Sequence, residues 1–309
     1  RPGTVRKLVN CFESPEMLQS IKDDPVPDFP EACDDDPQYQ FELGKSWVKG
    51  RELPGGSGGL IEVDTFTHVM QHLPNYKAAG PMGDRYEHIK AMPRQLVYSM
   101  SRRYLNAQAS SGCQDLWQAG LLLAGDEGKC DDDGDPIPRP ITVGLAMRRI
   151  VGRFPAAQLK QDFARILSQF RQLGIAVDSG IEVAYHTVCT AMAAYEAELD
   201  GEEQAGVSPW ALQMDFTDGF TRAKRARGFR ACQQLFPSLL KYMHFCYNGT
   251  GRLWIVHGGK LVRTVSNVEG FWQGDAIGGH SFCMAIVDFM DHIKAKFQPH
   301  TALDRTIDP

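Results

Sequence analysis

The spacing of apolar and polar residues predicts both helices and strands. Two alternating runs flank Gly258-Gly259 between residues 253 and 265, the pattern of a β-hairpin with a glycine turn. Residues 210–216 form a short apolar run that carries Asp215 near its end, as a buried strand does. The predicted helices cover residues 64–73, 85–105, 141–151, 156–167, 182–199, 219–235 and 280–294.

Proline, glycine and acidic residues interrupt this pattern in three places. Between residues 23 and 36 prolines alternate with acidic residues, and such a segment repels itself and resists regular structure. Residues 54–59 have the composition of a flexible linker. We therefore predict that residues 1–60 are an acidic, Pro/Gly-rich lead-in and linker. Residues 126–140 are predicted to be an acidic, proline-bearing loop.

The composition limits the class of protein. Of the 309 residues, 43% are hydrophobic and 23% are charged, which excludes wholesale disorder. No run of about 18 uncharged apolar residues occurs, so we expect no membrane-spanning helix. The net charge of -5 argues against a uniformly basic nucleic-acid binder, although a local basic groove is compatible with it. The eight cysteines form no Cys-x-x-Cys pair and are expected to be reduced, which favours an intracellular protein.

Residues 215–220 carry the first candidate chemistry. An Asp at the end of an apolar strand can hold a divalent cation, and Mg²⁺ prefers one or two carboxylates together with phosphate oxygens. The next helix would offer free backbone N–H groups to a triphosphate. Phe220, five residues after Asp215, could lie under a sugar and exclude a 2′-hydroxyl. The alternative interpretation is a strand-to-helix turn with a capping Asp and a core Phe.

A second motif, Gly270-Phe271-Trp272-Gln273-Gly274, follows the predicted hairpin and precedes an apolar helix. Together with Asp215 and Phe220, it resembles the reverse transcriptases of non-LTR retrotransposons and their bacterial relatives. Three further blocks in the same order are similar to that family: Lys77-Ala78-Ala79-Gly80-Pro81 with Glu87-His88-Ile89-Lys90, Arg139-Pro140-Ile141 with Arg148-Arg149, and Gln172-Leu173-Gly174-Ile175 with Gly180, Glu182 and His186. Each block is weak alone, and their shared order is what makes the resemblance specific.

The resemblance implies an α+β fold of the right-hand polymerase type, with an antiparallel sheet and packed helices. Residues 61–170 would form a fingers-like region and residues 171–309 a partial palm. The activity implied for the intact parent is template-directed addition of dNTPs to a primer 3′ end. Its partners would be an RNA template, a DNA primer and dNTPs. Two Mg²⁺ ions would activate the primer hydroxyl and stabilise the leaving pyrophosphate.

The resemblance also implies roles for single residues. Asp215 would be the catalytic metal ligand and Phe220 the sugar gate. The other residues implied to bind the nucleotide are Arg139, Phe216, Asp218, Gly219, Gln273 and Gly274. The basic residues expected to follow a nucleic-acid backbone are Lys77, Lys90, Arg148, Arg149, Arg222, Lys224 and Arg225. For the last three, a solvated helix face with mixed charges is the alternative.

Several positions depart from the family pattern. The family's second pair of catalytic carboxylates lies in an aromatic-x-Asp-Asp hairpin, which does not occur before Pro309. We therefore expect an incomplete palm that holds at most one Mg²⁺ well and is inactive alone. Met82 stands where the family usually has Asp, and Asp275-Ala276 replaces a commoner small-Pro pair. The acidic residues 131–135 would repel phosphates if they faced the triphosphate.

These departures leave other functions open. The main alternative is a catalytically inactive polymerase-like module that binds RNA or a protein partner. A viral RNA-dependent RNA polymerase is a third possibility, and Phe220 argues against it because those enzymes accept a 2′-hydroxyl. His68 and His72 are four residues apart on a predicted helix, and two histidines with this spacing can bind zinc. Without an evident third ligand, we interpret them as surface or packing histidines.

Overall fold

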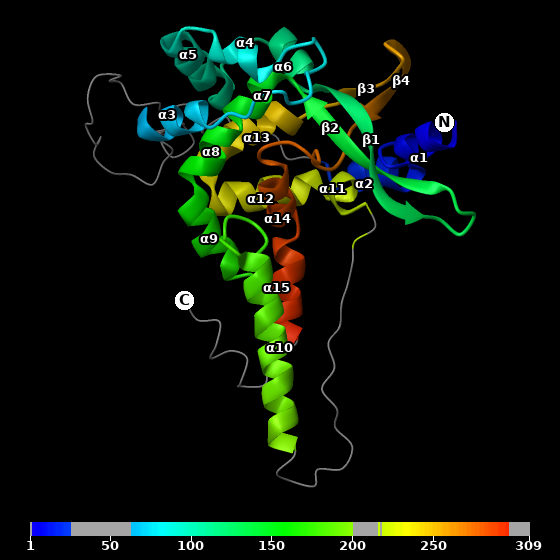
Figure 1. The fold of residues 1–309 in the computed structure, drawn as a ribbon, viewed down its shortest axis with the longest axis vertical. Helices are drawn as coiled ribbons and strands as arrows, with labels where there is room; N and C mark the ends of the chain where they lie inside the picture. The colour runs from blue at the N-terminus through cyan, green and yellow to red at the C-terminus, as the bar shows by residue number, and fades with distance from the viewer. Residues whose placement is uncertain (1, 26–62, 200–215, 217, 297–309) are drawn as a thin grey trace. The chain divides into compact units, whose positions relative to one another are not determined.

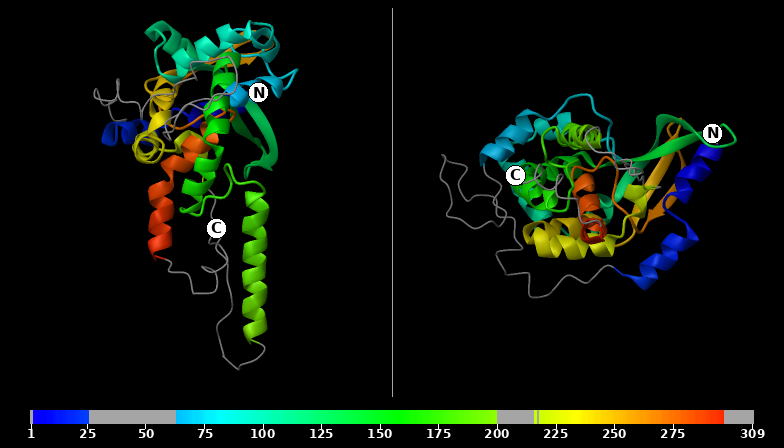
Figure 2. Two further views of the ribbon diagram at one scale, coloured as in Figure 1. Left: turned by 90° about the vertical axis from the view of Figure 1, so that its left-hand side faces the viewer. Right: turned by 90° about the horizontal axis from the view of Figure 1, so that it is seen from below.

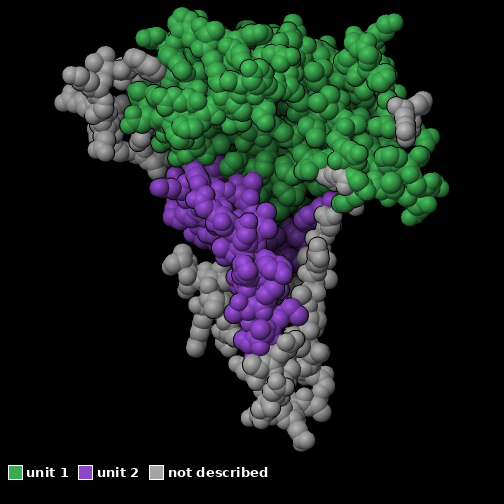
Figure 3. All heavy atoms as spheres, viewed as in Figure 1, with its two compact units in different colours: residues 1–159, 218–286 green, residues 160–217, 287–309 purple. Residues whose placement is uncertain are grey.

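The computed structural model describes residues 2–25, 63–199, 216 and 218–296. The chain forms a mixed α+β structure with two compact units (Figures 1 and 3). The first unit contains residues 1–159 and 218–286, and the second contains residues 160–217 and 287–309. These boundaries differ from the predicted limits of fingers and palm, so that functional division stays a prediction.

The first unit contains a four-stranded sheet with the order β2-β1-β3-β4. Its strands are β1 (Ala119–Cys130), β2 (Pro136–Gly144), β3 (Gly251–His257) and β4 (Lys260–Asn267). Strands β1 and β2 pair antiparallel, and so do β3 and β4. Strands β1 and β3 pair parallel along Ala119 to Leu121. The sheet is therefore mixed, whereas an antiparallel sheet was predicted.

The predicted hairpin at residues 253–265 is confirmed by β3 and β4. Gly258 and Gly259 connect the strands with φ values of 57° and 74°. Both residues thus adopt the left-handed conformation that a tight hairpin turn requires and that glycine adopts at little cost. The side chains of Leu253, Ile255 and Val265 are buried, which fixes the register of the hairpin.

The prediction of a loop at residues 126–140 is wrong, because these residues form most of the β1–β2 hairpin. Its turn is closed by Asp131, whose carboxylate accepts the backbone N–H groups of Asp133 (3.2 Å) and Asp135 (2.8 Å). The prolines of β2 are tolerated because this strand lies at the edge of the sheet. The predicted helix at residues 141–151 accordingly begins only at Ala146, in α7 (Ala146–Val151).

Other predicted helices agree with the structure or are divided. The helices α3 (Val63–Gln71) and α10 (Gly180–Leu199) confirm two predictions. The predicted helix at residues 85–105 is divided at Pro93, because proline disfavours helical backbone at the residue before it. The divided predictions give α4 (Tyr86–Lys90) with α5 (Arg94–Leu105), α8 (Arg153–Gln158) with α9 (Lys160–Ser168), α11 (Gly219–Arg222) with α12 (Arg225–Leu235), and α14 (Gly278–Ala285) with α15 (Val287–Lys296).

The start of the chain is more ordered than predicted. Residues 2–25, here called the N-terminal strap, contain α1 (Pro2–Asn10) and α2 (Pro15–Asp23). Leu8 and Phe12 are buried, and α1 packs against β2 (Figure 1). Apolar burial at these positions therefore outweighs the proline-rich, acidic composition nearby. Residues 26–62, which include the predicted linker, lie outside the described residues.

Helix α12 packs against α13 (Leu240–Tyr247), both yellow in Figure 2, and against α14. Phe229, Tyr242 and Met284 are each almost fully buried there. The short helices α6 (Ser111–Trp117) and η3 (Pro237–Leu239) complete this unit. No helix in the described part of the chain is long and apolar enough to span a bilayer.

The second unit contains α9, α10 and α15. Lys294 on α15 donates to the backbone carbonyl of Gln169, at a distance of 3.4 Å. Phe163 and Leu167 of α9 are fully buried. By contrast, Ile181 and Tyr185 of α10 are exposed.

Candidate functional site

The 270–274 loop joins two segments that are predicted to bind a nucleotide. The backbone N–H of Phe271 donates to the carbonyl of Phe220 at 2.7 Å. On the other side, the carbonyl of Gln273 accepts the N–H of Thr142 at 3.0 Å. Segments far apart in the sequence are thus held together by main-chain hydrogen bonds, which depend little on side-chain identity.

Two glycines allow this close approach. Gly270 has a φ of 71°, donates its N–H to the Ala223 carbonyl at 3.1 Å, and has no room for a Cβ because the Thr221 carbonyl lies in that space. Gly274 has a φ of 107°, and a Cβ there would lie 3.0 Å from the carbonyl oxygen of Thr142. A side chain at either position would strain the backbone and push the loop away from its neighbours.

Arg139 lies on β2, the strand that the 270–274 loop contacts. It is opposite Gly125 in the β1–β2 register and is exposed. Thr142, three residues further along the same strand, donates to Gln273. The 270–274 loop therefore contacts the strand that carries Arg139 and the segment that carries Phe220.

The carboxylate of Asp218 holds the turn before α11. Asp218 has a φ of 52°, and its carboxylate accepts from Arg222 Nε at 3.3 Å and from the Cys11 thiol at 3.7 Å. Burial raises the pKa of Cys11 to about 12, and the Asp218 carboxylate adds to this rise. The thiol is therefore protonated at neutral pH and acts as the donor.

The ring of Phe220 stacks on Phe282 of α14. The ring centroids are 4.9 Å apart and the planes differ by 18°. This contact fixes the ring that we predict to exclude a 2′-hydroxyl. The same geometry also suits the alternative interpretation of Phe220 as a packing residue.

The predicted metal ligand, Asp215, lies outside the described residues. Phe216 is 46% exposed and contacts Phe289 edge-to-face, with both residues in the second unit. In the ranges that the structure describes, no group of three or more His, Cys, Asp or Glu residues could hold a metal ion. Asp218 is tied to Arg222, so the described residues by themselves do not fit a Mg²⁺ site. A cation at Asp215 stays a prediction.

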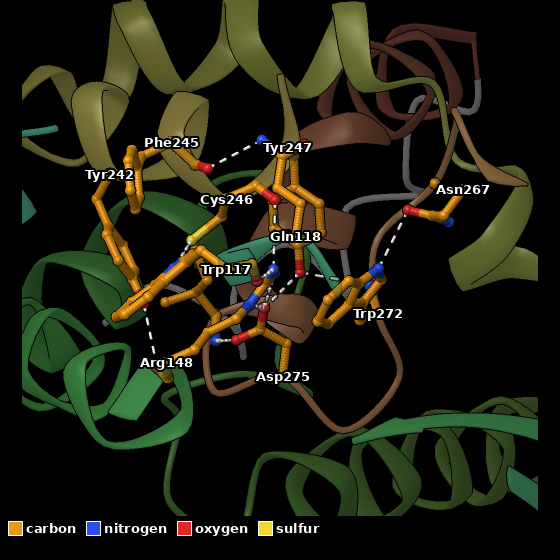
Figure 4. A network of polar contacts seen from close by, with 12 residues as sticks. Trp117, Gln118, Arg148, Tyr242, Phe245, Cys246, Tyr247, Asn267, Trp272 and Asp275 are labelled. Atoms are coloured by element: carbon orange, nitrogen blue, oxygen red, sulfur yellow. Dashed lines mark hydrogen bonds and ion pairs between the residues drawn. The ribbon is translucent and has the colours of Figure 1, made fainter. Parts of the chain in front are cut away.

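Arg148 lies at the centre of a buried polar network (Figure 4). Its Nε and Nη2 atoms lie 2.9 and 2.5 Å from Asp275 Oδ2. Its Nη1 donates to the carbonyl of Trp117 at 2.8 Å, and its Cζ lies 3.6 Å from the ring centroid of Trp272. Tyr247 donates its hydroxyl to the same Asp275 oxygen at 2.8 Å.

This network corrects one predicted role and gives Asp275 a structural one. Arg148 is fully buried and its donors are used within the protein, so it supports the fold and cannot reach a nucleic-acid backbone. Burial by itself would lower the pKa of its guanidinium, but Asp275 offsets this and the pKa lies above its ordinary value. Asp275 is the counterion of Arg148, and both side chains are almost fully buried.

Arg225 is a second correction. It is 1% exposed, and its guanidinium donates to the carbonyls of Gly270 (2.9 Å) and Tyr247 (2.8 Å) and to the Asn267 side chain. Its backbone N–H donates to Glu269 at 2.7 Å. Burial lowers the pKa of the Arg225 guanidinium, and Glu269 opposes that effect. Arg225 therefore anchors the 270–274 loop and is unavailable to a phosphate.

The other predicted nucleic-acid contacts differ in exposure. Lys77 and Arg222 are exposed. Lys90 donates to the carbonyl of Leu73 and to the side chain of Asn75, at 2.5 and 2.6 Å, so it also ties a turn together. A role in nucleic-acid binding for these residues and for Lys224 stays a prediction.

A cavity of about 450 Å³ lies in the first unit beside the 270–274 loop. Helices α3, α4, α7 and α8 contribute to its wall, together with the loop. Its lining residues are His68, Val69, His72, Tyr86, Arg149, Arg153, Ala156, Ala157, Gly274 and Ala276. The imidazole rings of His68 and His72 have centroids 4.1 Å apart. Their exposure agrees with the prediction of surface histidines, but sequence spacing did not indicate a cavity.

Acidic residues of the N-terminal strap bond to donors on other elements. Glu13 accepts the N–H of Ser266 on β4 at 2.7 Å. Asp24 pairs with the guanidinium of Arg230 on α12 through two 3.0 Å contacts. The hydrogen bond from Arg230 lowers the pKa of Asp24. These bonds hold the strap against β4 and α12, and the Cys11–Asp218 contact holds it beside the turn before α11.

Sequence reasoning missed the functional candidates whose partners are distant in the chain. Tyr86 and Arg153 belong to no motif, and they become candidates only because α4 and α8 meet at the cavity. His68 and His72 carried one signal, their spacing of four residues, which was interpreted as surface or packing. No family model matches this chain, and no curated protein matches it.

Proposed function

We propose that this chain is the fingers-like region and part of the palm of a reverse transcriptase-like polymerase. In the intact parent it takes part in template-directed addition of dNTPs to a primer 3′ end. The observation that carries the proposal is the 270–274 loop. Its hydrogen bonds join the segment of Phe220, the predicted sugar gate, to the strand that carries Arg139, and the family resemblance assigns both segments to nucleotide binding.

The roles proposed for the residues follow from this arrangement. Phe220, fixed by Phe282, excludes a 2′-hydroxyl by its bulk. Arg139 presents a planar guanidinium that suits the oxygens of a triphosphate. Gln273 and Gly274 line the nucleotide and template side, where the missing side chain of Gly274 allows close approach.

Primer extension by the intact parent tests the proposal. The assay uses an RNA template, a labelled DNA primer, dNTPs and Mg²⁺. We expect Asp215→Asn to reduce extension by at least about 100-fold, because this carboxylate would hold the cation that stabilises the negative charge of the transition state. Asp115→Asn, an exposed acid on α6, is the matched control and should extend normally. Extension by Asp215→Asn at the wild-type rate would refute the proposal.

A second variant tests the sugar gate. We expect Phe220→Ala to raise incorporation of ribonucleotides relative to deoxyribonucleotides by about tenfold or more, because it removes the steric bar to a 2′-hydroxyl. Its thermal stability must be measured alongside, since Phe220 also packs on Phe282. An unchanged sugar preference in a folded variant contradicts the gating role.

The second candidate function is a polymerase-like module that binds RNA or a protein partner without catalysis. The basic cavity favours it, because binding an anion there needs no catalytic carboxylate. A parent protein that binds template RNA but does not extend a primer, under conditions in which a control polymerase does, would support this candidate over the enzyme.

A further inference from the structure

The cavity beside the 270–274 loop has an uneven charge. Two arginines and two histidines line it, and its lining includes no Asp or Glu. Among the residues that the structure describes, no carboxylate forms an ion pair with Arg149 or Arg153. Cations that are partly removed from water are costly unless an anion or acceptor compensates them. The cavity is therefore electrostatically suited to an anionic ligand.

Arg149 is positioned by the protein but keeps donor capacity. It is 9% exposed, and its Nη2 donates to the carbonyl of Ala78 at 2.9 Å. Its Cζ lies 4.7 Å from the ring centroid of Tyr86, which holds the guanidinium plane by a cation–π contact. Its Nε is buried without a hydrogen-bond partner. A buried donor without an acceptor is uncommon in folded proteins and is explained when a ligand supplies the acceptor.

Arg153 and the histidine pair extend the same basic wall. Arg153 lies on α8, the helix that follows the one with Arg149. Its Cζ lies 5.8 Å from the ring centroid of Tyr86, the ring that Arg149 also contacts. His68 lies on α3 and His72 directly follows this helix, and both rings are exposed. The Nδ1 of His72 lies 2.8 Å from the His68 carbonyl, and the remaining ring nitrogens can donate hydrogen bonds into the cavity. A guanidinium fork flanked by further N–H donors matches the oxygens of a phosphate ester.

We propose that this cavity binds a backbone phosphate of a single-stranded nucleic acid. Its volume of about 450 Å³ lies within the range of small-ligand sites and holds a phosphate with its adjoining sugar. Gly274 forms part of the wall, so the strand passes next to the loop that joins Phe220 to β2. The inference rests on the proposed function in naming a nucleic-acid strand as the carrier of the phosphate.

A free nucleotide carries the same phosphate chemistry, so the experiment measures both ligands separately. The full chain is titrated without Mg²⁺ against a short fluorescein-labelled single-stranded RNA, followed by anisotropy. dATP is titrated in parallel by calorimetry. The test variants are Arg153→Gln and the double variant His68→Gln/His72→Gln. Arg103→Gln on α5 and His257→Gln in the β3–β4 hairpin are the matched controls, because both native residues are exposed and lie outside the cavity lining.

We expect Arg153→Gln and the double histidine variant each to weaken RNA binding by about tenfold, because each removes charge-assisted or polar bonds to phosphate. The two controls should stay within about twofold of the wild type, and dATP binding should be the same for all proteins. Arg149 is avoided because its bond to Ala78 also supports the fold. Thermal melting of each variant establishes that it is folded.

The outcomes separate this inference from the proposed function. If the wild type binds RNA and the cavity variants bind it equally well, the cavity inference is overturned and the proposed function stands. If the cavity variants lose dATP binding and keep RNA binding, the inference that a nucleic-acid strand is the ligand is overturned. If RNA binding depends on the cavity but the intact parent extends no primer, the cavity inference stands and the polymerase activity fails.

Discussion

Replacing Arg148 with methionine would remove the cation from the buried network of the first unit. Methionine fills a similar volume and makes no hydrogen bond to Asp275. The Asp275 carboxylate would keep the Tyr247 hydroxyl at 2.8 Å, but would lose both guanidinium contacts. The carbonyl of Trp117 would lose its donor as well. The folded state would then contain a buried charge with incomplete compensation.

The size of the effect follows from these contacts. Removing one partner of a buried, hydrogen-bonded ion pair costs about 3–5 kcal/mol, mostly because the other charge is left uncompensated. The side chains of Arg148 and Asp275 are each only 1% exposed, so solvent screens the pair little. A typical domain is stable by about 5–15 kcal/mol. We therefore expect Arg148→Met to reduce the free energy of unfolding by about 3–5 kcal/mol.

Equilibrium urea denaturation, followed by tryptophan fluorescence, measures this change. Trp272 lies against the guanidinium and reports on the network directly. The double variant Arg148→Met/Asp275→Leu removes both charges, and we expect it to be more stable than Arg148→Met by about 1–3 kcal/mol. Arg103→Met, at an exposed position on α5, is the control and should change stability by less than about 0.5 kcal/mol.

Two results would refute this reasoning. One is a loss of less than about 1 kcal/mol for Arg148→Met with an unchanged dependence of stability on urea, which would mean that the pair is not buried in solution. The other is a double variant that is as unstable as Arg148→Met, because the cost would then lie in packing and not in the uncompensated charge of Asp275.

Three further predictions concern other parts of the first unit. Burial lowers the pKa of His280 to about 4, from an ordinary value of 6.5, so the unfolded chain binds more protons between these values and stability falls as the pH falls. Between pH 7 and pH 4, measured by urea denaturation, we expect His280→Asn to lose about 3 kcal/mol less stability than the wild type. An identical dependence of stability on pH for the two proteins would contradict this prediction. Gly270→Ala should lower the free energy of unfolding by more than about 3 kcal/mol. Gly259→Ala, at a similar positive φ but in open space, should lower it by only about 1–2 kcal/mol. Equal shifts in melting temperature for the two variants would show that the loop relieves the clash with the Thr221 carbonyl. Asp24→Ala should lower the free energy of unfolding by only about 0.2–1 kcal/mol, and by less at high salt, because its ion pair with Arg230 is partly exposed. A larger loss of stability in denaturant titrations would argue that the strap holds the fold together.

The amino-acid sequence alone determined the elements whose signals are local. The β3–β4 hairpin follows from Gly258-Gly259 between alternating runs, because the turn and both strands are specified within a few residues. The helices α3 and α10 follow from apolar spacing over the same short range. The motif at residues 270–274 was also visible in the sequence.

Tertiary structure decided the remainder, because burial and pairing depend on residues that are distant in the sequence. Residues 126–140 look like a loop by composition, but pairing with β1 makes them a strand at the sheet edge, where proline is tolerated. Arg148 looks like a phosphate ligand until Asp275, far along the chain, is placed beside it. The basic cavity likewise exists only because α3, α4, α7 and α8 meet at Gly274, and no local pattern encodes that meeting.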